Sequence, residues 1–356
     1  MWIICVSIIL AGVVIVAVEK MPDTSSNYSH LNYDKYVTVG KYKGLEAEQK
    51  ADKVTSESIK TRIDSEVGKQ TETKTVKKGT VKKGDTITVD YTGTLNGEKF
   101  IGGSGKDQVI QVGSGGMLKD FEDSLVGKNV GDTFKTDVTF PKKYDNQQVA
   151  GKTANFEITI KSKTDVKEYK YDDEFLKKFT KYDNKKDYEA YIKSVLEKEA
   201  AETAEETCKT DLWNNVLDDS KVKQYPKKQY KYEYGIAKGT AESYAEMYGV
   251  SLSDYITNYM QSTPEEFNKQ LKEEAKETTK EKLVAYKIAE NENISVSEED
   301  EEEWLKEQLK AAGITVKDFE SQNETTLENY IKENDVKSQA VIKKVKDFIY
   351  KEADIK

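Results

Sequence analysis

The chain has 356 residues, which exceeds most single hydrophobic cores and suits two or three domains. Charged residues make up 34% and the formal net charge is -9, so nucleic acid is a poor partner, because an acidic chain repels phosphate. One histidine, His30, and one arginine, Arg62, are too few for a histidine triad or a guanidinium clamp. Cys5 and Cys208 cannot form a CxxC metal site, and no nucleotide loop is present. We therefore expect no metal and no cofactor.

The first twenty residues contain an apolar run from Trp2 to Val18 that only Ser7 interrupts. At about 1.5 Å per helical residue, such a run barely crosses a hydrocarbon core of about 30 Å. It has no basic residues before it, unlike a typical secretory signal. Residues 1–20 are predicted to be a membrane anchor or an export signal, and a buried helix of the fold is the alternative.

Residues 21–78 are polar and are expected to form a linker that contains a strand at 36–39 and a short helix at 54–67. Residues 79–163 differ, because runs of alternating polarity at 86–91, 109–112, 134–140 and 155–160 are each bounded by turn residues. Asn96-Gly97 predicts a tight hairpin, since both central residues of a type I′ turn need a positive φ. A helix is expected only at 117–125.

Residues 164–356 show helical spacing of apolar residues. One long helix is predicted from about 188 to 216, and others begin at the capping signals of Thr263 and Ser297. The acidic run 298–303 fits the positive end of the latter helix, which Gly313 should close. A last helix is expected from about 325 to 350.

The turns and apolar residues between 84 and 157 occur in a recognisable order. They include Asp90-Tyr-Thr-Gly93, Asn96-Gly-Glu-Lys-Phe100, Met117-Leu-Lys-Asp-Phe-Glu-Asp123, Val130-Gly-Asp132, Phe140-Pro141 and Asn155-Phe-Glu157. This order resembles the FKBP-type peptidyl-prolyl isomerase domain, above all the version found in the bacterial trigger factor family. Residues 36–45 and 173–179 are similar to the segments that flank that domain in the family. The predicted fold class is therefore α+β: an FKBP-like antiparallel sheet wrapped on a short helix, followed by an all-α chaperone region of long helices.

The resemblance implies a pocket for proline, and it assigns residues to it. The implied catalytic wall is Tyr91, Phe100, Met117, Leu118, Phe121 and Phe156, and the implied substrate contacts are Ile101, Val112, Tyr144 and Val149. Turning an X-Pro bond costs about 18 to 20 kcal/mol, because amide resonance is lost. An apolar pocket that fits the twisted amide lowers this barrier without an acid, a base or a nucleophile. The alternative for these apolar positions is the plain core of a small β module.

Several positions depart from the family pattern. Ile101 stands where an acidic residue is common, Gln108 where a second aromatic is usual, and Asn146 where a tyrosine is usual. Asp120 and Ser124 replace usual glycines. We expect these changes to lower turnover and to alter sequence preference.

The resemblance of the helical region implies that it binds unfolded or nascent polypeptides. Its many tyrosines can contact varied sequences, but they can equally pack within the protein, and that is the alternative. We expect no counterpart of the family's ribosome-binding domain before residue 79, so we do not expect the ribosome as a partner. An extracytoplasmic location is expected, and a cytoplasmic one is the alternative. The resulting hypothesis is an isomerase and ATP-independent chaperone for exported polypeptides. A non-catalytic holdase and a surface interaction protein are the alternatives.

Overall fold

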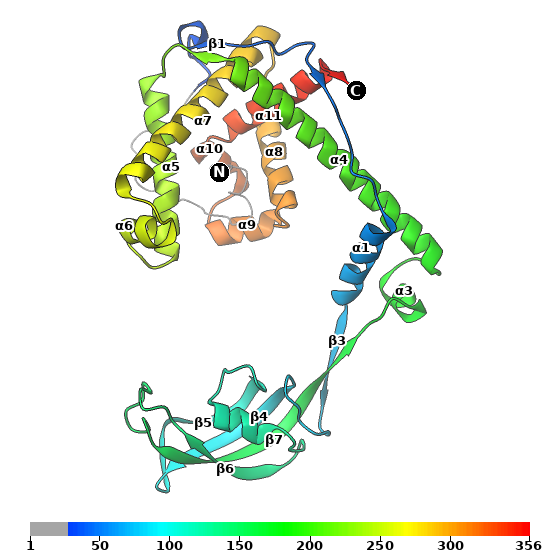
Figure 1. The fold of residues 1–356 in the computed structure, drawn as a ribbon, viewed down its shortest axis with the longest axis vertical. Helices are drawn as coiled ribbons and strands as arrows, with labels where there is room; N and C mark the ends of the chain where they lie inside the picture. The colour runs from blue at the N-terminus through cyan, green and yellow to red at the C-terminus, as the bar shows by residue number, and fades with distance from the viewer. Residues whose placement is uncertain (1–27) are drawn as a thin grey trace. The chain divides into compact units, whose positions relative to one another are not determined.

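The computed structural model describes residues 28–356, so the predicted membrane or export segment, 1–20, lies outside the described residues. These residues form two compact units: 53–197, and 28–52 together with 198–356. Among residues 28–356, no helix combines the length and apolar character needed to cross a bilayer. Figure 1 shows the elements of both units.

The unit of residues 53–197 is built on an antiparallel sheet. Its strands are β3 (Thr71–Val76), β4 (Thr86–Leu95), β5 (Glu98–Gln111), β6 (Thr133–Thr139) and β7 (Thr153–Glu168). The strand order is β3-β7-β4-β5, with β6 also paired to β7. The central strand is β7, which is long enough to pair with β4 on one edge and with β6 and β3 on the other. The predicted boundary at residue 163 therefore falls inside a strand, because β7 continues to pair with β3 up to Glu168.

Local sequence signals explain the hairpin and the helix of this sheet. Asn96 and Gly97 have φ values of 53° and 88°, as the predicted turn between β4 and β5 requires. The short helix α2 (Lys119–Leu125) buries Phe121 and Leu125 and contacts β6. The predicted FKBP-like arrangement of an antiparallel sheet on a short helix is thus confirmed.

A second, smaller core in this unit joins three helices. Helix α1 (Ser56–Gly68) packs with α3 (Asp173–Phe179) and with the first turns of α4 (Lys185–Asp219). The buried residues of this core are Ile63, Val67, Phe175, Leu176, Tyr188 and Ile192 from the helices, and Tyr169 from the segment between β7 and α3. Thr55 begins α1 with a capping box, in which its side chain and that of Ser58 each bond the other's backbone amide.

The unit of residues 28–52 and 198–356 is helical. Its helices are α5 (Lys227–Met247), α6 (Leu252–Asp254), the π-helix η3 (Tyr255–Tyr259), α7 (Pro264–Glu292), α8 (Glu298–Ala311), α9 (Val316–Asn323), α10 (Leu327–Glu333) and α11 (Val336–Lys351). Helix α7 begins at the predicted capping box of Thr263 and Glu266, and α8 begins at that of Ser297 and Asp300. Helices α5 and α11 both contact α7, as Figure 1 also shows. The core takes most of its residues from α7, α11 and the part of α4 after residue 198, including Leu212, Val216, Leu283, Ile288, Val345 and Ile349.

Two expectations about this unit are corrected. Part of the expected linker is not a linker: Tyr28, Tyr33 and Val37 are buried in the helical core, because the 3-10 helix η2 (Tyr33–Lys35) contacts α7. The short strand β1 (Val37–Thr38) pairs with β8 (Lys221–Val222), and β2 (Glu46–Ala47) pairs with β9 (Asp354–Ile355).

The predicted last helix, 325–350, is two helices in the structure. Asn334 adopts an extended conformation after α10, and its side-chain amide bonds the carbonyl of Tyr330. The next residue, Asp335, turns inward to accept a hydrogen bond of 2.7 Å from the buried Lys282 of α7. Glu233 of α5 accepts a second bond from Lys282 at 2.8 Å. The break between α10 and α11 therefore lets the Asp335 carboxylate pair with Lys282. Helical periodicity alone does not predict this pairing.

Candidate active site

The predicted catalytic side chains come from four parts of the sheet unit. Tyr91 is on β4, Phe100 on β5 and Phe156 on β7, while Met117, Leu118 and Phe121 lie at the start of α2. The register places Gly93 of β4 opposite Phe156, and Tyr91 opposite Ile158. Strand pairing therefore brings residues that are 65 positions apart in the chain into one cluster, and the loop before α2 adds the rest.

The aromatic rings of this cluster are in direct contact. Phe121 meets Tyr91 at 5.3 Å between centroids and Phe156 at 5.6 Å, both edge to face. Phe100 meets Phe156 edge to face at 6.1 Å. Such pairs stabilise beyond their buried area by about 0.5–1.5 kcal/mol each. The six predicted residues are therefore brought together rather than scattered, because Met117 and Leu118 pack on the same core.

Exposure separates the predicted residues into two groups. Tyr91, Phe100, Met117 and Leu118 are partly exposed, whereas Phe121 and Phe156 are buried at 1% and 5% exposure. Among the predicted substrate contacts, Ile101 is 83% exposed and Tyr144 is 36% exposed. Val112 and Val149, in contrast, are buried at 1% and 0%, so they support the cluster as core residues and present no surface to a substrate.

Phe140 is an aromatic residue of the cluster that the predicted site omits. Its ring lies 5.9 Å from that of Phe100, 6.3 Å from that of Phe156 and 4.8 Å from that of Tyr144. It therefore joins Tyr144, in the loop after Pro141, to the main cluster. The Phe140-Pro141 dipeptide was part of the recognised pattern, so the signal was present in the sequence.

Three glycines that the predicted site also omits allow the rings to approach the sheet. A Cβ at Gly93 would lie 2.7 Å from the Phe156 ring, and one at Gly103 would lie 2.7 Å from the Phe100 ring. A Cβ at Gly105 would come within 2.8 Å of the Tyr91 ring. The clustering of glycines in this stretch of sequence was the available signal, but only the packed rings show which glycines matter.

The residues that depart from the family pattern have polar contacts around the cluster. The side-chain Nδ2 of Asn146 donates a hydrogen bond of 3.0 Å to the Ile101 carbonyl, which joins the 141–151 loop to β5. The Asp120 carboxylate accepts one of 3.0 Å from the Thr139 amide at the end of β6. The side-chain Nε2 of Gln108 donates to the nearby Lys106 carbonyl at 2.9 Å.

Comparison with known proteins assigns families to both halves of the chain. Residues 77–161 match the family of FKBP-type peptidyl-prolyl cis-trans isomerases. Residues 186–350 match the family of the bacterial trigger factor protein C-terminus. The chain therefore contains an FKBP-type domain and a trigger factor C-terminal domain.

Curated relatives of this trigger factor-like chain include several trigger factors. That of Halothermothrix orenii is 33% identical over 186 residues, which cover 52% of this chain and 43% of the relative. That of Alkaliphilus oremlandii is 35% identical over 174 residues, or 49% of this chain and 41% of the relative. The alignments thus span less than half the length of these relatives. A solved structure from work on promiscuous substrate recognition by the trigger factor chaperone is 15% identical, with a TM-score of 0.45, and the match covers 89% of this chain and 73% of that chain.

The helical unit of the trigger factor-like chain has an exposed aromatic patch, which we define as Tyr244, Met247, Tyr248, Tyr255, Tyr259 and Met260. Tyr248 lies 4.9 Å from Tyr259 and 5.9 Å from Tyr255, ring to ring. Met247 is 65% exposed, and Tyr248 and Tyr259 are each 52% exposed. Gly249, with a φ of 67°, turns the chain between α5 and α6 so that these rings meet. Exposed aromatic rings that contact one another in this way are typical of an interaction surface.

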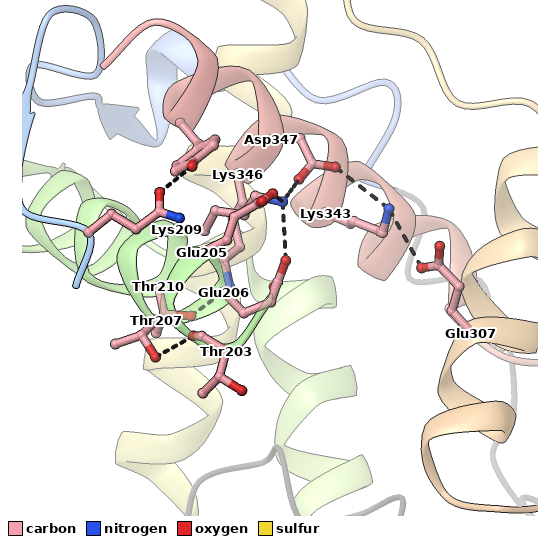
Figure 2. Close-up of polar contacts among 12 residues, drawn as sticks. Thr203, Glu205, Glu206, Thr207, Lys209, Thr210, Glu307, Lys343, Lys346 and Asp347 are labelled. Atoms are coloured by element: carbon pink, nitrogen blue, oxygen red, sulfur yellow. Dashed lines mark hydrogen bonds and ion pairs between the residues drawn. The ribbon is translucent and has the colours of Figure 1, made fainter. Parts of the chain in front are cut away.

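A hollow along α4 in the same unit is lined by charged and hydroxyl-bearing residues instead. Glu202, Thr203, Glu206, Thr207 and Thr210 line it. Figure 2 shows the neighbouring network, in which Lys209 is bonded by Asp347 and Glu205 at 2.8 Å and by Glu206 at 3.1 Å. Burial alone would lower the pKa of Lys209, but these carboxylates outweigh burial and raise it. The Thr203 and Thr207 hydroxyls donate to carbonyls of their own helix, and the Thr210 hydroxyl accepts a hydrogen bond of 3.2 Å from Lys346 of α11, so these three hydroxyls already have partners.

Proposed function

We propose that the chain catalyses the cis-trans isomerisation of peptidyl-prolyl bonds. The observation that carries this proposal is the aromatic cluster around Phe121, with Tyr91 and Phe100 partly exposed, within an FKBP-type domain. An X-Pro amide that enters an apolar environment leaves water, and its resonance is weaker there than in water. Less resonance energy is then lost when the amide twists, so the barrier to rotation falls. The cluster needs no ionisable group to act, which fits a chain with one histidine.

The test is a proline isomerisation assay on a tetrapeptide with the full chain. Tyr91→Ala should reduce kcat/KM by about tenfold or more, because it removes a wall of the cluster. Phe134→Ala is the matched control. Phe134 is an aromatic residue on the same core, and within residues 28–356 no ring contact joins it to the cluster, so kcat/KM should be retained. A wild-type rate equal to that of buffer would reject the isomerase proposal.

The second proposed activity is ATP-independent binding of unfolded or nascent polypeptides, including proline-containing segments. It is supported by the exposed aromatic patch and by the match to the trigger factor C-terminus. The double variant Tyr248→Ser/Tyr259→Ser should suppress the aggregation of a denatured client less well than the wild type. Tyr191→Ser, which changes a 43% exposed tyrosine of the other unit, is the control and should leave suppression unchanged. Normal suppression with a dead isomerase would favour the non-catalytic holdase.

We also propose that the clients are exported polypeptides and that the protein acts outside the cytoplasm. The support is the apolar run from Trp2 to Val18. Fractionation of producing cells, followed by sequencing of the mature N-terminus, tests this location. Recovery of the intact chain from the cytosolic fraction alone would contradict it.

A further inference from the structure

The loop that precedes α2 is organised by a buried carboxylate. Glu122 is only 4% exposed, although it lies in a short surface helix. Its Oε1 accepts a hydrogen bond of 2.9 Å from the Met117 amide, and its Oε2 accepts one of 3.2 Å from the Gly115 amide. The side chain thus reaches back along the chain and binds the loop that leads into its own helix.

The conformation of this loop suits an anion. Gly113 and Gly115 have φ values of 85° and 83°, and Ser114 lies between them. Successive amides near a left-handed residue can converge on one negative charge, as in the backbone nests that bind anions. Here the charge comes from the protein itself.

The electrostatics agree with an ionised side chain. Burial alone would raise the pKa of Glu122, but hydrogen bonds from the Met117, Gly115 and Gly113 amides outweigh burial and lower the pKa. A carboxylate held by several amides is a strong, charge-assisted contact.

The loop is also the part of the site that holds Met117 and Leu118. Within residues 28–356, no hydrogen bond to the Leu118 amide is found, while the Met117 amide is taken by Glu122. The Leu118 amide is therefore available to a substrate carbonyl, and its place depends on the loop that Glu122 holds.

We propose that Glu122 is a positioning residue of the isomerase site, whose buried carboxylate fixes the 113–117 loop and thereby places Met117 and the Leu118 amide against the substrate. This inference rests on the proposed isomerase function. Glu122 takes no part in the reaction itself.

The test compares Glu122→Gln with Asp123→Asn in the full chain. The Gln side chain keeps the size but replaces one acceptor with an NH₂ donor that faces amide donors. Asp123 is the adjacent carboxylate, but it is exposed and paired with Lys119, so its change is the matched control. We expect kcat/KM to fall about tenfold in Glu122→Gln and to be retained in Asp123→Asn.

The split between kinetic constants separates positioning from stability. A variant that is merely less folded has less active enzyme and an unchanged KM, whereas a displaced Met117 and Leu118 should raise KM. The NMR signals of the Gly115 and Met117 amides should also move, and their hydrogen exchange should accelerate. An unchanged KM in folded Glu122→Gln, as judged by urea unfolding, would overturn the proposal.

A second variant reaches the same loop without changing the charge. Gly115→Ala strains a left-handed position around which there is open space, so it should also raise KM. If both changes act through the loop, the double variant should lose less than the sum of the two single losses. Additive losses would overturn the proposal. A wild-type chain with no isomerase activity would reject the proposed function and the positioning role together, whereas an active wild type with an unaffected Glu122→Gln would reject only the latter.

Discussion

Two residues at the rim of the aromatic cluster, Ile101 and Asn146, differ from the residues that the family usually has there. Ile101 is 83% exposed, so its side chain gains nothing from packing in the free protein. Asn146, another departure, bonds the Ile101 backbone and not its side chain. The side chain at position 101 is therefore free to be changed without disturbing the loop.

Restoring an acidic residue with Ile101→Asp should increase kcat/KM by about tenfold. A rim carboxylate can accept a hydrogen bond from a substrate amide, and bonds to charged groups are worth about 1.5 kcal/mol or more. The measurement is the isomerisation rate over a set of tetrapeptides that differ in the residue before proline. Val109→Asp, at a 71% exposed position of the same strand, controls for added charge. Equal rates for both variants and the wild type would contradict this role of position 101.

Glycine at position 93 should be required for stability. In Gly93→Ala the new Cβ would approach the Phe156 ring to 2.7 Å and the Gly103 carbonyl oxygen to 2.9 Å. Overpacking of this kind costs about 1–3 kcal/mol in the free energy of unfolding. Urea unfolding measures it, and Gly68→Ala at the end of α1, where nothing lies within 4 Å, is the control. A Gly93→Ala variant as stable as that control would show that the rings move aside at no cost.

At the scale of elements, the start of α8 joins two helices. Asp300 accepts hydrogen bonds from the Ser297 amide at 2.7 Å and from Lys344 of α11 at 2.6 Å. These contacts, with that of Lys344 the largest, lower the pKa of Asp300 to about 2. The acidic run at this helix start is therefore a structural feature, as its place at the positive end of the helix predicted.

Asp300→Asn should reduce stability by about 1 kcal/mol at neutral pH, because it weakens the capping box and removes a partly exposed ion pair. Since the folded pKa lies below the ordinary value of 3.8, the contribution of Asp300 is fully present above about pH 4. It is lost as the pH falls toward 2. Urea titrations at several pH values should show the two proteins converging in that window, and a constant difference down to pH 2 would rule out the charge as the cause.

At the scale of the whole molecule, each unit has a core of its own. Ile158 and Leu283 are both 0% exposed, one in the sheet unit and the other in the helical unit. Trp213 and Trp304 are both in the helical unit, and the sheet unit has no tryptophan. Once Trp2 is replaced, tryptophan fluorescence therefore reports on the helical unit alone, while circular dichroism reports on both units.

We expect the two units to unfold in separate transitions. In a Trp2→Phe background, Leu283→Ala should lower the midpoint seen by tryptophan fluorescence, since such a substitution costs about 2–5 kcal/mol. Ile158→Ala should leave that midpoint in place and add an earlier phase to the circular dichroism. Coincident transitions for both probes in every variant would show a single cooperative structure instead.

The sequence by itself determined the features that depend on near neighbours. The Asn96-Gly97 hairpin, the capping boxes of Thr263 and Ser297, and the switch from a period of two to a helical period are local signals, because caps and turns are satisfied within a few residues. The ordered motifs between Asp90 and Glu157 also identified the ring-bearing positions.

Only the tertiary structure decided how distant residues share space. It divided 325–350 into two helices at Asp335, buried Tyr28 in the helical core, and removed Val112 and Val149 from the predicted substrate contacts. It also showed that Glu122, which looks like an ordinary charged residue in the sequence, accepts hydrogen bonds from backbone amides of the preceding loop. Burial and pairing of this kind depend on groups that approach only after the chain has folded, so neither periodicity nor composition carries them.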